Sequence, residues 1–319
     1  MPKGRSPQYV NKIKEKLTMK KIFFFLMAFA AVAFAACSGD DEQTIDDNII
    51  RLSSNIGASQ GVTRATLTDA EAQNTQFASS KSVFVEVYKY NGSTAYTTGN
   101  YTTSNTSGAM TGSLFYPADG SNIDICAYYP STISSSSTSF TVGATQTSAA
   151  NYQSYDLMYA TKLTNKAKGS SHALTFNHAL TKIIVNLQAG NGVTDSDLTT
   201  HVTALKLKSL KPTAGFAISG GAVGTITASG IAADVDILGT TKPGNHCAII
   251  VPQQKTSGAF IEVTYKGNTY TYSLASNTTF EKGKVYTYNI TVNATGISLS
   301  SNSINNWTST TAVNGSVTL

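Results

Sequence analysis

Short runs in which apolar and polar residues alternate recur along most of the chain, and they constrain its fold more than any other feature. In SVFVEVYKYNG, for example, Val83, Val85 and Val87 fall on one face of an extended strand, and an Asn-Gly pair then predicts a tight turn. About fifteen such runs follow one another at intervals of roughly 8–15 residues, bounded by Gly, Asn, Ser and Pro. Almost no stretch has helical periodicity. We therefore predict an all-β protein built of two sandwiches.

The composition agrees with extracellular β-structure. Only 13% of the residues are charged, while Ser, Thr, Gly, Asn, Tyr and Val are abundant. The formal net charge of +5 comes from residues 1–36, which hold seven Lys or Arg and one acidic residue. From Cys37 onward, 16 basic and 17 acidic residues nearly cancel. The basic character is therefore no evidence for nucleic-acid binding, and we expect no nucleic-acid partner.

Residues 19–37, MKKIFFFLMAFAAVAFAAC, contain the three parts of an export signal. Lys20-Lys21 forms a positively charged start, and the apolar run that follows is short for a membrane span. Ala35-Ala36 forms a small-residue cleavage site directly before Cys37. We therefore predict a lipoprotein in which the Cys37 thiol carries lipid such as palmitate and tethers the chain to a membrane.

Two other interpretations of this segment stay open, a plain cleaved signal and a single anchor helix. Residues 1–18 add nothing that an export signal needs, so Met19 is the predicted true start within a signal region of residues 1–36. The acidic run SGDDEQTIDDN after Cys37 predicts a solvated spacer.

A predicted strand and an isolated arginine follow this spacer. In NIIRLSSNIG, Ile50, Leu52 and Ile56 lie at even spacing, which is typical of a half-buried strand. Arg64, in GVTRATLTDA, lies among small and hydroxylated residues, and no neighbouring acid looks like its ion-pair partner. Residues 68–71 then resemble a capping box that begins a short helix.

The rest of the chain divides into two predicted domains. TNKAKGSS, residues 164–171, has the composition of a linker, so we place a boundary near residue 172. This gives an N-terminal sandwich of residues 65–172 and a C-terminal sandwich of residues 173–319. LTFNHALTKIIVNLQ is long and apolar enough to form one central strand. The C-terminal tail has alternating apolar residues that fit either a donor strand or a final strand of its own domain, namely Val313, Val317 and Leu319.

The sequence contains no phosphate loop and none of the motifs H-E-x-x-H, C-x-x-C or G-x-S-x-G. His172 and His178 would share a strand face but lie about 20 Å apart, too far to bind one metal ion. We expect His178 to be a packed core residue whose ring nitrogens bond to the backbone. Asp234 and Asp236 offer too few oxygen ligands for Ca²⁺, so we expect solvated strand carboxylates. These patterns predict no enzyme, no cofactor and no metal site.

The cysteines and tyrosines support structural interpretations at least as well as functional ones. Cys126 and Cys247 lie in separate predicted strands, and we expect two buried free thiols rather than a disulfide. The tyrosine clusters fit an ordinary sheet face or a sugar-stacking platform, and they comprise Tyr128-Tyr129 and Tyr270-Tyr272.

The chain as a whole resembles the Bacteroidales fimbrillin-like pilins. The resemblance rests on Cys37 after its signal, on CAYYP, and on the ordered pieces YDLMYA, LTFNHALTKI, AIIVPQ, FEKGKVYTYNITVNATGISLS and INNWT. It runs from Cys37 to the C-terminus, and its specificity lies in the order and spacing of these pieces. It implies two tandem transthyretin-like (Ig-like) β-sandwich domains after a lipoprotein signal peptide.

The resemblance also implies a fimbrial (pilus) subunit for cell adhesion. An Arg-specific protease would cut the Arg64–Ala65 bond and remove residues 37–64, the lipidated propeptide with the first strand. Loss of Ile50, Leu52 and Ile56 would open an apolar groove, and refilling it is worth about 5–9 kcal/mol before ordering costs. A strand of a neighbouring subunit would fill this groove by strand addition. Head-to-tail exchange does not close, so it yields a filament.

The implied partners are other fimbrial subunits, the outer membrane through the lipid before cleavage, and a host glycan or protein. The resemblance places the protein in the cell-surface fimbrium, and it leaves stalk, tip and anchor roles open. The main alternative is a surface lipoprotein that binds glycan without polymerising, which needs an exposed aromatic platform on one sandwich face. A cell-surface enzyme is the weaker alternative, because the sequence offers no catalytic constellation.

Overall fold

β-strands make up most of the described chain. The computed structural model describes residues 48–57, 77–104, 108–239 and 246–307, which belong to one compact unit. These residues form 23 strands and two short helices, α2 (Ala149–Ser154) and α3 (Asp195–His201). The predicted all-β sandwich fold is confirmed, although the strands outnumber the expected fifteen or so because several have only two or three residues. In the described ranges no helix is long and apolar enough to cross a membrane.

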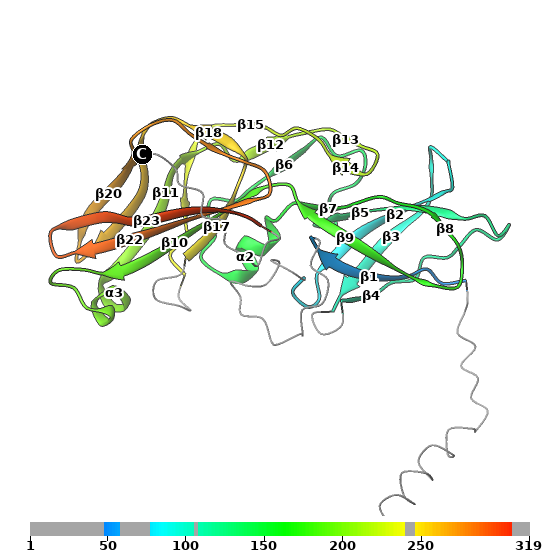
Figure 1. Cartoon of the computed structure of the whole chain (residues 1–319), viewed down its shortest axis with the longest axis horizontal. Helices are drawn as coiled ribbons and strands as arrows, with labels where there is room; N and C mark the ends of the chain where they lie inside the picture. The colour runs from blue at the N-terminus through cyan, green and yellow to red at the C-terminus, as the bar shows by residue number, and fades with distance from the viewer. Residues whose placement is uncertain (1–47, 58–76, 105–107, 240–245, 308–319) are drawn as a thin grey trace, which may run out of the picture. The chain divides into compact units, whose positions relative to one another are not determined.

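The strands nearest the N-terminus pair into a closed ring. They are β1 (Arg51–Ile56), β2 (Ser82–Lys89), β3 (Ala95–Thr103), β4 (Ala109–Thr111), β5 (Ile123–Tyr129), β7 (Met158–Ala160), β8 (Leu163–Lys166) and β9 (Ser171–His178). Their hydrogen-bonded order is β2-β3-β4-β1-β9-β7-β5-β8, and a further pairing joins β2 to β5. The ring thus passes through seven strands, with β8 attached outside it. Each of the seven strands thus has a neighbour on both sides, although β3 meets β4 only through Thr102 and Thr103. Figure 1 shows β1 beside β9 and β4.

Alternation along these strands directs one set of side chains into a shared core. Val83, Val85 and Val87 are completely buried, as their spacing predicts. Phe77, the first described residue after Gly57, enters the same core. Its ring packs edge-on against Phe176, with the ring centroids 4.9 Å apart. Aromatic packing therefore anchors Phe77 in the core of this ring.

The C-terminal half contributes two four-stranded sheets that share a second core. One sheet has the order β17-β10-β22-β23 and the other β16-β11-β19-β20. The first consists of β10 (Thr181–Ala189), β17 (His246–Ile250), β22 (Lys284–Asn293) and β23 (Gly296–Asn306). The second consists of β11 (Val202–Leu210), β16 (Ala233–Asp236), β19 (Gly258–Tyr265) and β20 (Asn268–Leu274). Apolar side chains from both sheets form one cluster, as a sandwich requires.

Short strands complete the fold. β6 (Ser139–Thr141), β12 (Thr213–Gly215) and β15 (Thr227–Ser229) form a three-stranded sheet. Two pairs are formed by β13 (Ile218–Ser219) with β14 (Ala222–Val223), and by β18 (Gln253–Lys255) with β21 (Thr278–Phe280). Because β6 comes from the N-terminal half and β12 from the C-terminal half, the small sheet joins residues about 70 positions apart.

The segment LTFNHALTKIIVNLQ does not form the single central strand that we predicted. β9 ends at His178 and β10 begins at Thr181, and the two strands belong to different sheets. Ala179 and Leu180 between them are completely buried. The Ala179 amide donates to the Leu157 carbonyl and the Leu180 carbonyl accepts from the Gly283 amide, both at 2.8 Å. Because Ala179 and Leu180 are themselves apolar, the sequence gives no sign of the break between β9 and β10.

The predicted linker at residues 164–171 is instead the end of β8, a turn and the first residue of β9. Its polar composition reflects an exposed turn within the N-terminal sheet. The boundary near residue 172 therefore falls inside β9, whereas sheet membership changes at residues 179–180. The division into two domains stays a prediction. The short helix expected at residues 68–71 lies outside the described residues.

His246 makes stability depend on pH. It is buried, and its Nδ1 accepts a hydrogen bond of 3.0 Å from the Gly239 amide. Burial lowers the pKa of His246 from 6.5 to about 4. The unfolded chain thus takes up this proton below pH 6.5 and the folded chain only below about pH 4, so stability falls as pH drops through that window. The loss is about 3 kcal/mol.

We expect the variant His246→Gln to lack this pH-dependent loss of stability, because Gln retains an acceptor but does not titrate. Urea unfolding of the purified protein between about pH 7 and pH 4 measures the free energy of unfolding at each pH. His201→Gln, at the half-buried C-terminal end of α3, is the control and should keep the dependence of the unmodified protein. Parallel stability curves for His246→Gln and the unmodified protein would contradict the assignment.

Candidate functional site

β1 is held on both edges by strands that lie far away in the sequence. It runs parallel to β9 through six consecutive pairs, from Arg51 opposite Ser171 to Ile56 opposite Phe176. On its other edge it is antiparallel to β4, where Leu52 faces Met110. β1 is therefore an inner strand of the closed ring. Without it, β4 and β9 would each present a row of unpaired backbone groups.

The side chains of β1 alternate between the core and the outside. Ile50 and Ile56 are 0% exposed and Leu52 is 3% exposed, and all three belong to the core of the ring. The half-buried strand that we predicted from their spacing is thus present. Ser54 points the same way and is 2% exposed, with its Oγ donating to the Gly108 carbonyl at 3.3 Å. The groove under β1 therefore needs a small residue at this position, which the apolar spacing did not reveal.

Backbone contacts hold β1 independently of its side chains. The Ile50 amide donates to the Leu114 carbonyl at 2.8 Å, and the Gly57 amide donates to the Phe176 carbonyl at 2.9 Å. The Tyr101 hydroxyl donates to the Ile50 carbonyl at 2.7 Å. Burial raises the pKa of Tyr101 to about 12, so this hydroxyl keeps its proton at physiological pH. Any extended strand of suitable side-chain pattern satisfies these backbone contacts.

The remaining predicted processing and assembly residues cannot be placed in the structure. They lie outside the described residues and comprise Cys37, Arg64, Ala65, Val313, Val317 and Leu319. The described chain stops at Trp307, which is 3% exposed and whose amide donates to the Gly283 carbonyl at 2.9 Å. The tail therefore starts from a fixed residue.

The two histidines considered for a metal site have separate structural roles. His172 forms a hydrogen bond of 2.6 Å with the Tyr116 hydroxyl. His178 is buried, as expected, but its Nδ1 lies 2.9 Å from Asp156 Oδ1 and not against the backbone, so the predicted partner was wrong. Its ring stacks on Trp307 with the centroids 3.7 Å apart. Within the described ranges no group of three His, Cys, Asp or Glu side chains could hold a metal ion.

The strand carboxylates and cysteines are also accounted for locally. Asp234 pairs with Lys208 at 2.5 Å and Asp236 with Lys206 at 3.5 Å, so both carboxylates face lysines of β11. Neither of the two described cysteines forms a disulfide, as expected. Cys126 is buried, but Cys247 is only half-buried, which corrects half of that expectation.

Of the two interpretations left open for the tyrosine clusters, the structure supports ordinary sheet faces and not a sugar-stacking platform. Tyr128 and Tyr129 are 0% and 4% exposed, and they point to opposite faces of β5. Tyr270 and Tyr272 are half-buried against the C-terminal core. The neighbouring residues Tyr128 and Tyr129 thus indicate a strand that is buried on both faces.

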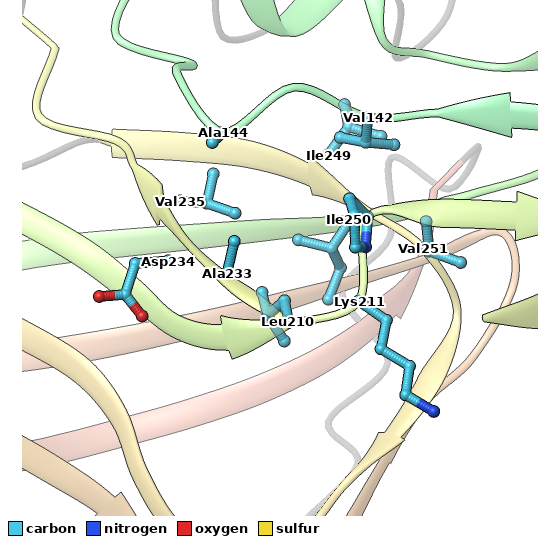
Figure 2. Close-up of a pocket in the computed structure, with 11 residues that line it drawn as sticks. Val142, Ala144, Leu210, Lys211, Ala233, Asp234, Val235, Ile249, Ile250 and Val251 are labelled. Carbon is cyan, nitrogen blue, oxygen red and sulfur yellow. The ribbon is translucent and has the colours of Figure 1, made fainter. Parts of the chain in front are cut away.

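A small cavity near the ends of β11, β16 and β17 is shown in Figure 2. Its volume is about 20 Å³, and apolar side chains such as Leu210, Val235 and Ile250 surround it. The charged ends of Asp234 and Lys211 point away from these side chains. A space of this size holds about one water molecule, so it is not a ligand site.

The paired sheets and their two cores place the chain among the β-sandwich proteins. A family model described as fimbrillin-like matches residues 63–307, so the chain belongs to the fimbrillin-like family. The resemblance seen in the sequence is thereby confirmed. The family is one of structural fimbrial and adhesion proteins, and membership makes the chain a fimbrial protein of the cell surface.

Two solved structures show the same fold. A candidate cell adhesion protein from Bacteroides uniformis has a TM-score of 0.62 and 20% identity, covering 83% of this chain and 100% of its own. A second, from Bacteroides ovatus, has a TM-score of 0.58 and 20% identity, covering 81% of this chain and 97% of its own. No curated protein matches the sequence significantly.

Proposed function

We propose that the protein is a fimbrial subunit that is exported as a lipoprotein on Cys37, cut at the Arg64–Ala65 bond and assembled by donor-strand exchange. One observation carries this proposal. β1 fills an inner position of a closed ring, yet it precedes the segment that contains Arg64. Cutting that segment separates β1 from the chain without breaking any other strand that the structure describes. The residues matched by the family model begin at position 63 and leave β1 outside, which supports the same division.

The vacated groove would favour a replacement strand. Its floor would be the apolar surface that Ile50, Leu52 and Ile56 now cover, worth about 5–9 kcal/mol before ordering costs. Its walls would be the edges of β4 and β9, together with the Tyr101 hydroxyl. A neighbouring subunit's tail, with Val313, Val317 and Leu319 at even spacing, is the proposed donor. Repeating this head-to-tail contact builds a filament.

The distribution of arginine supports cleavage at Arg64. The whole chain has only three arginines, Arg5, Arg51 and Arg64. Arg5 precedes the predicted export signal, and Arg51 lies in β1, where the backbone is paired with β9. Proteases need an extended segment that fits their cleft, so a strand paired on both edges is a poor substrate. An Arg-specific protease acting on the folded precursor would therefore cut after Arg64.

Mass spectrometry of the N-terminus of the surface-exposed protein tests this proposal. We expect fibres to consist of chains that begin at Ala65, while the uncut precursor carries lipid on Cys37 and fractionates with the outer membrane. Labelling of whole cells with a membrane-impermeant biotin reagent, followed by capture of the labelled chains, restricts the measurement to surface-exposed chains. Fibres built from chains that still carry Cys37 would overturn the strand-exchange scheme.

A further inference from the structure

The outward face of β2 and β5 is polar but covered. Since Val83, Val85 and Val87 point into the core, Glu86 and Tyr88 point to the opposite face. In the antiparallel register, Glu86 lies opposite Cys126 and Tyr88 opposite Asp124. Glu86, Asp124 and Cys126 are nevertheless only 3–4% exposed. A polar sheet face usually contacts solvent, so this one is shielded by other parts of the chain.

A cavity of about 230 Å³ lies against this face. Four segments of the chain contribute to its walls besides the sheet, namely the turn after β2, the serine-rich loop after β5, the link between β7 and β8, and the turn between β13 and β14. Gly221 in the last turn approaches the sheet so closely that a Cβ atom there would lie 2.8 Å from the Cys126 sulfur. Exposed Gly92 and Ser93 at the rim connect the cavity to solvent. The volume is many times what one water needs.

The polar groups around the cavity are held in fixed positions. The buried Glu86 carboxylate accepts hydrogen bonds from the Tyr88 hydroxyl at 2.7 Å, from the Ser135 amide at 2.9 Å and from the Ser135 hydroxyl at 3.0 Å. Lys162 pairs with Asp124 at 3.0 Å, and its ammonium lies 5.9 Å from the centre of the Tyr88 ring. These contacts keep the Tyr88 ring and the Lys162 ammonium in place without a ligand.

One hydroxyl at the cavity is poorly hydrogen-bonded. Tyr128 lines the cavity and is 0% exposed, yet among the described residues its hydroxyl makes no hydrogen bond of good geometry, and the group beside it is the weakly accepting Cys126 thiol. Burial, with the Cys126 thiol beside it, raises the pKa of Tyr128, so the hydroxyl stays protonated. Leaving a buried hydroxyl unsatisfied costs free energy. A polar molecule in the cavity would supply the missing partner.

We propose that this cavity binds one neutral sugar residue at the end of a glycan. The Tyr88 ring offers an apolar surface, and the Tyr128 hydroxyl, Lys162 and Ser93 offer donors and acceptors, the combination that hydroxyl-rich rings need. The two carboxylates, Glu86 and Asp124, outweigh the single Lys162 charge, which disfavours anions. Sugar binding at this cavity does not depend on strand exchange. It would give each subunit an adhesive role at the surface of the fimbria.

Saturation-transfer difference NMR on the uncut protein, in a non-glycosidic detergent, tests the proposal. The probes are glucose, galactose, mannose, fucose, N-acetylglucosamine and the anionic N-acetylneuraminic acid. We expect at least one neutral sugar to bind with a dissociation constant of roughly 1 mM and the anionic sugar to bind at least tenfold more weakly. Absence of binding by every neutral sugar at about 50 mM, or a preference for the anionic sugar, would overturn it.

Three variants assign the binding to this cavity. Ser93→Trp fills the rim and should abolish binding, and Tyr88→Ala should weaken it at least tenfold by removing the ring. Tyr96→Ala removes an exposed tyrosine that does not line the cavity, so binding should be unchanged. Circular dichroism and thermal melting verify that each variant folds. Equal binding by Ser93→Trp and the unmodified protein would refute the assignment, whereas normal fibres from Ser93→Trp show that assembly is a separate function.

Discussion

A precursor carrying Arg64→Ala is expected to stay monomeric and lipidated and to form no fibres. The substitution removes the only arginine that the scheme exposes to a protease, so β1 stays between β4 and β9 and the groove stays filled. Polymerisation is then blocked by the subunit's own strand, because an attached strand competes at a very high effective concentration. Electron microscopy of cells and of purified protein, together with the mass of the N-terminal peptide, measures the outcome.

Two further variants sharpen this experiment. Arg51→Ala is the matched control, since it changes the other arginine near the cut but should leave cleavage and fibres normal. Arg64→Lys separates an arginine-specific protease, which should fail on it, from a general trypsin-like one, which should cut it. Normal fibres from Arg64→Ala would contradict the scheme, whether their chains keep Cys37 or begin at Leu52. Cleavage after Arg51 would leave Leu52 and Ile56 attached to the subunit, so the groove would not be emptied.

A synthetic peptide with the sequence NIIRLSSNIG is expected to stop the growth of fibres from cleaved subunits. Such a peptide restores the side chains of Ile50, Leu52 and Ile56 and the backbone bonds to β9. It occupies the groove that the next subunit needs, so each bound subunit ends a fibre. Refilling is worth about 5–9 kcal/mol before the peptide's ordering costs, so we expect inhibition at roughly micromolar peptide.

Matched peptides define which feature of β1 matters. Leu52→Asp puts a charge into the apolar floor and should abolish inhibition. Ser54→Trp should do the same by size alone, since Ser54 packs against Gly108 within the buried face. Ser53→Thr changes a half-buried outward position and should inhibit like the parent peptide. Equal inhibition by the parent and Leu52→Asp peptides would refute the groove. Light scattering of growing fibres measures all four.

The sequence predicted those features that depend on local periodicity. Val83, Val85 and Val87, and likewise Ile50, Leu52 and Ile56, alternate with polar residues and are buried accordingly. The sequence could not predict the pairing of β1 with β9. The paired residues of these parallel strands lie about 120 positions apart, and such a contact leaves no local pattern. The same limit explains His178, whose partner Asp156 lies 22 residues away in sequence.

Features that depend on tertiary covering were misjudged or missed. Glu86 and Tyr88 alternate with the core valines, so periodicity alone assigns them to solvent, and only the surrounding loops enclose them. α3 was missed although its signal is local. Thr194 and Asp197 form a capping box in which the Asp197 amide donates to the Thr194 hydroxyl at 3.1 Å. The helix has only seven residues, too short for a clear apolar period.

The pairing of β1 on both edges has a consequence for the lifetime of a fibre. In the proposed scheme, Arg51 is held in that strand until the Arg64–Ala65 bond is cut, and it then leaves with the released piece. A subunit beginning at Ala65 contains no arginine at all. A single cut by an arginine-specific enzyme would therefore leave no recognition site for that enzyme in the subunit. The finished fibre would therefore resist further cleavage by the protease that processes its subunits, and it would persist wherever that protease is abundant.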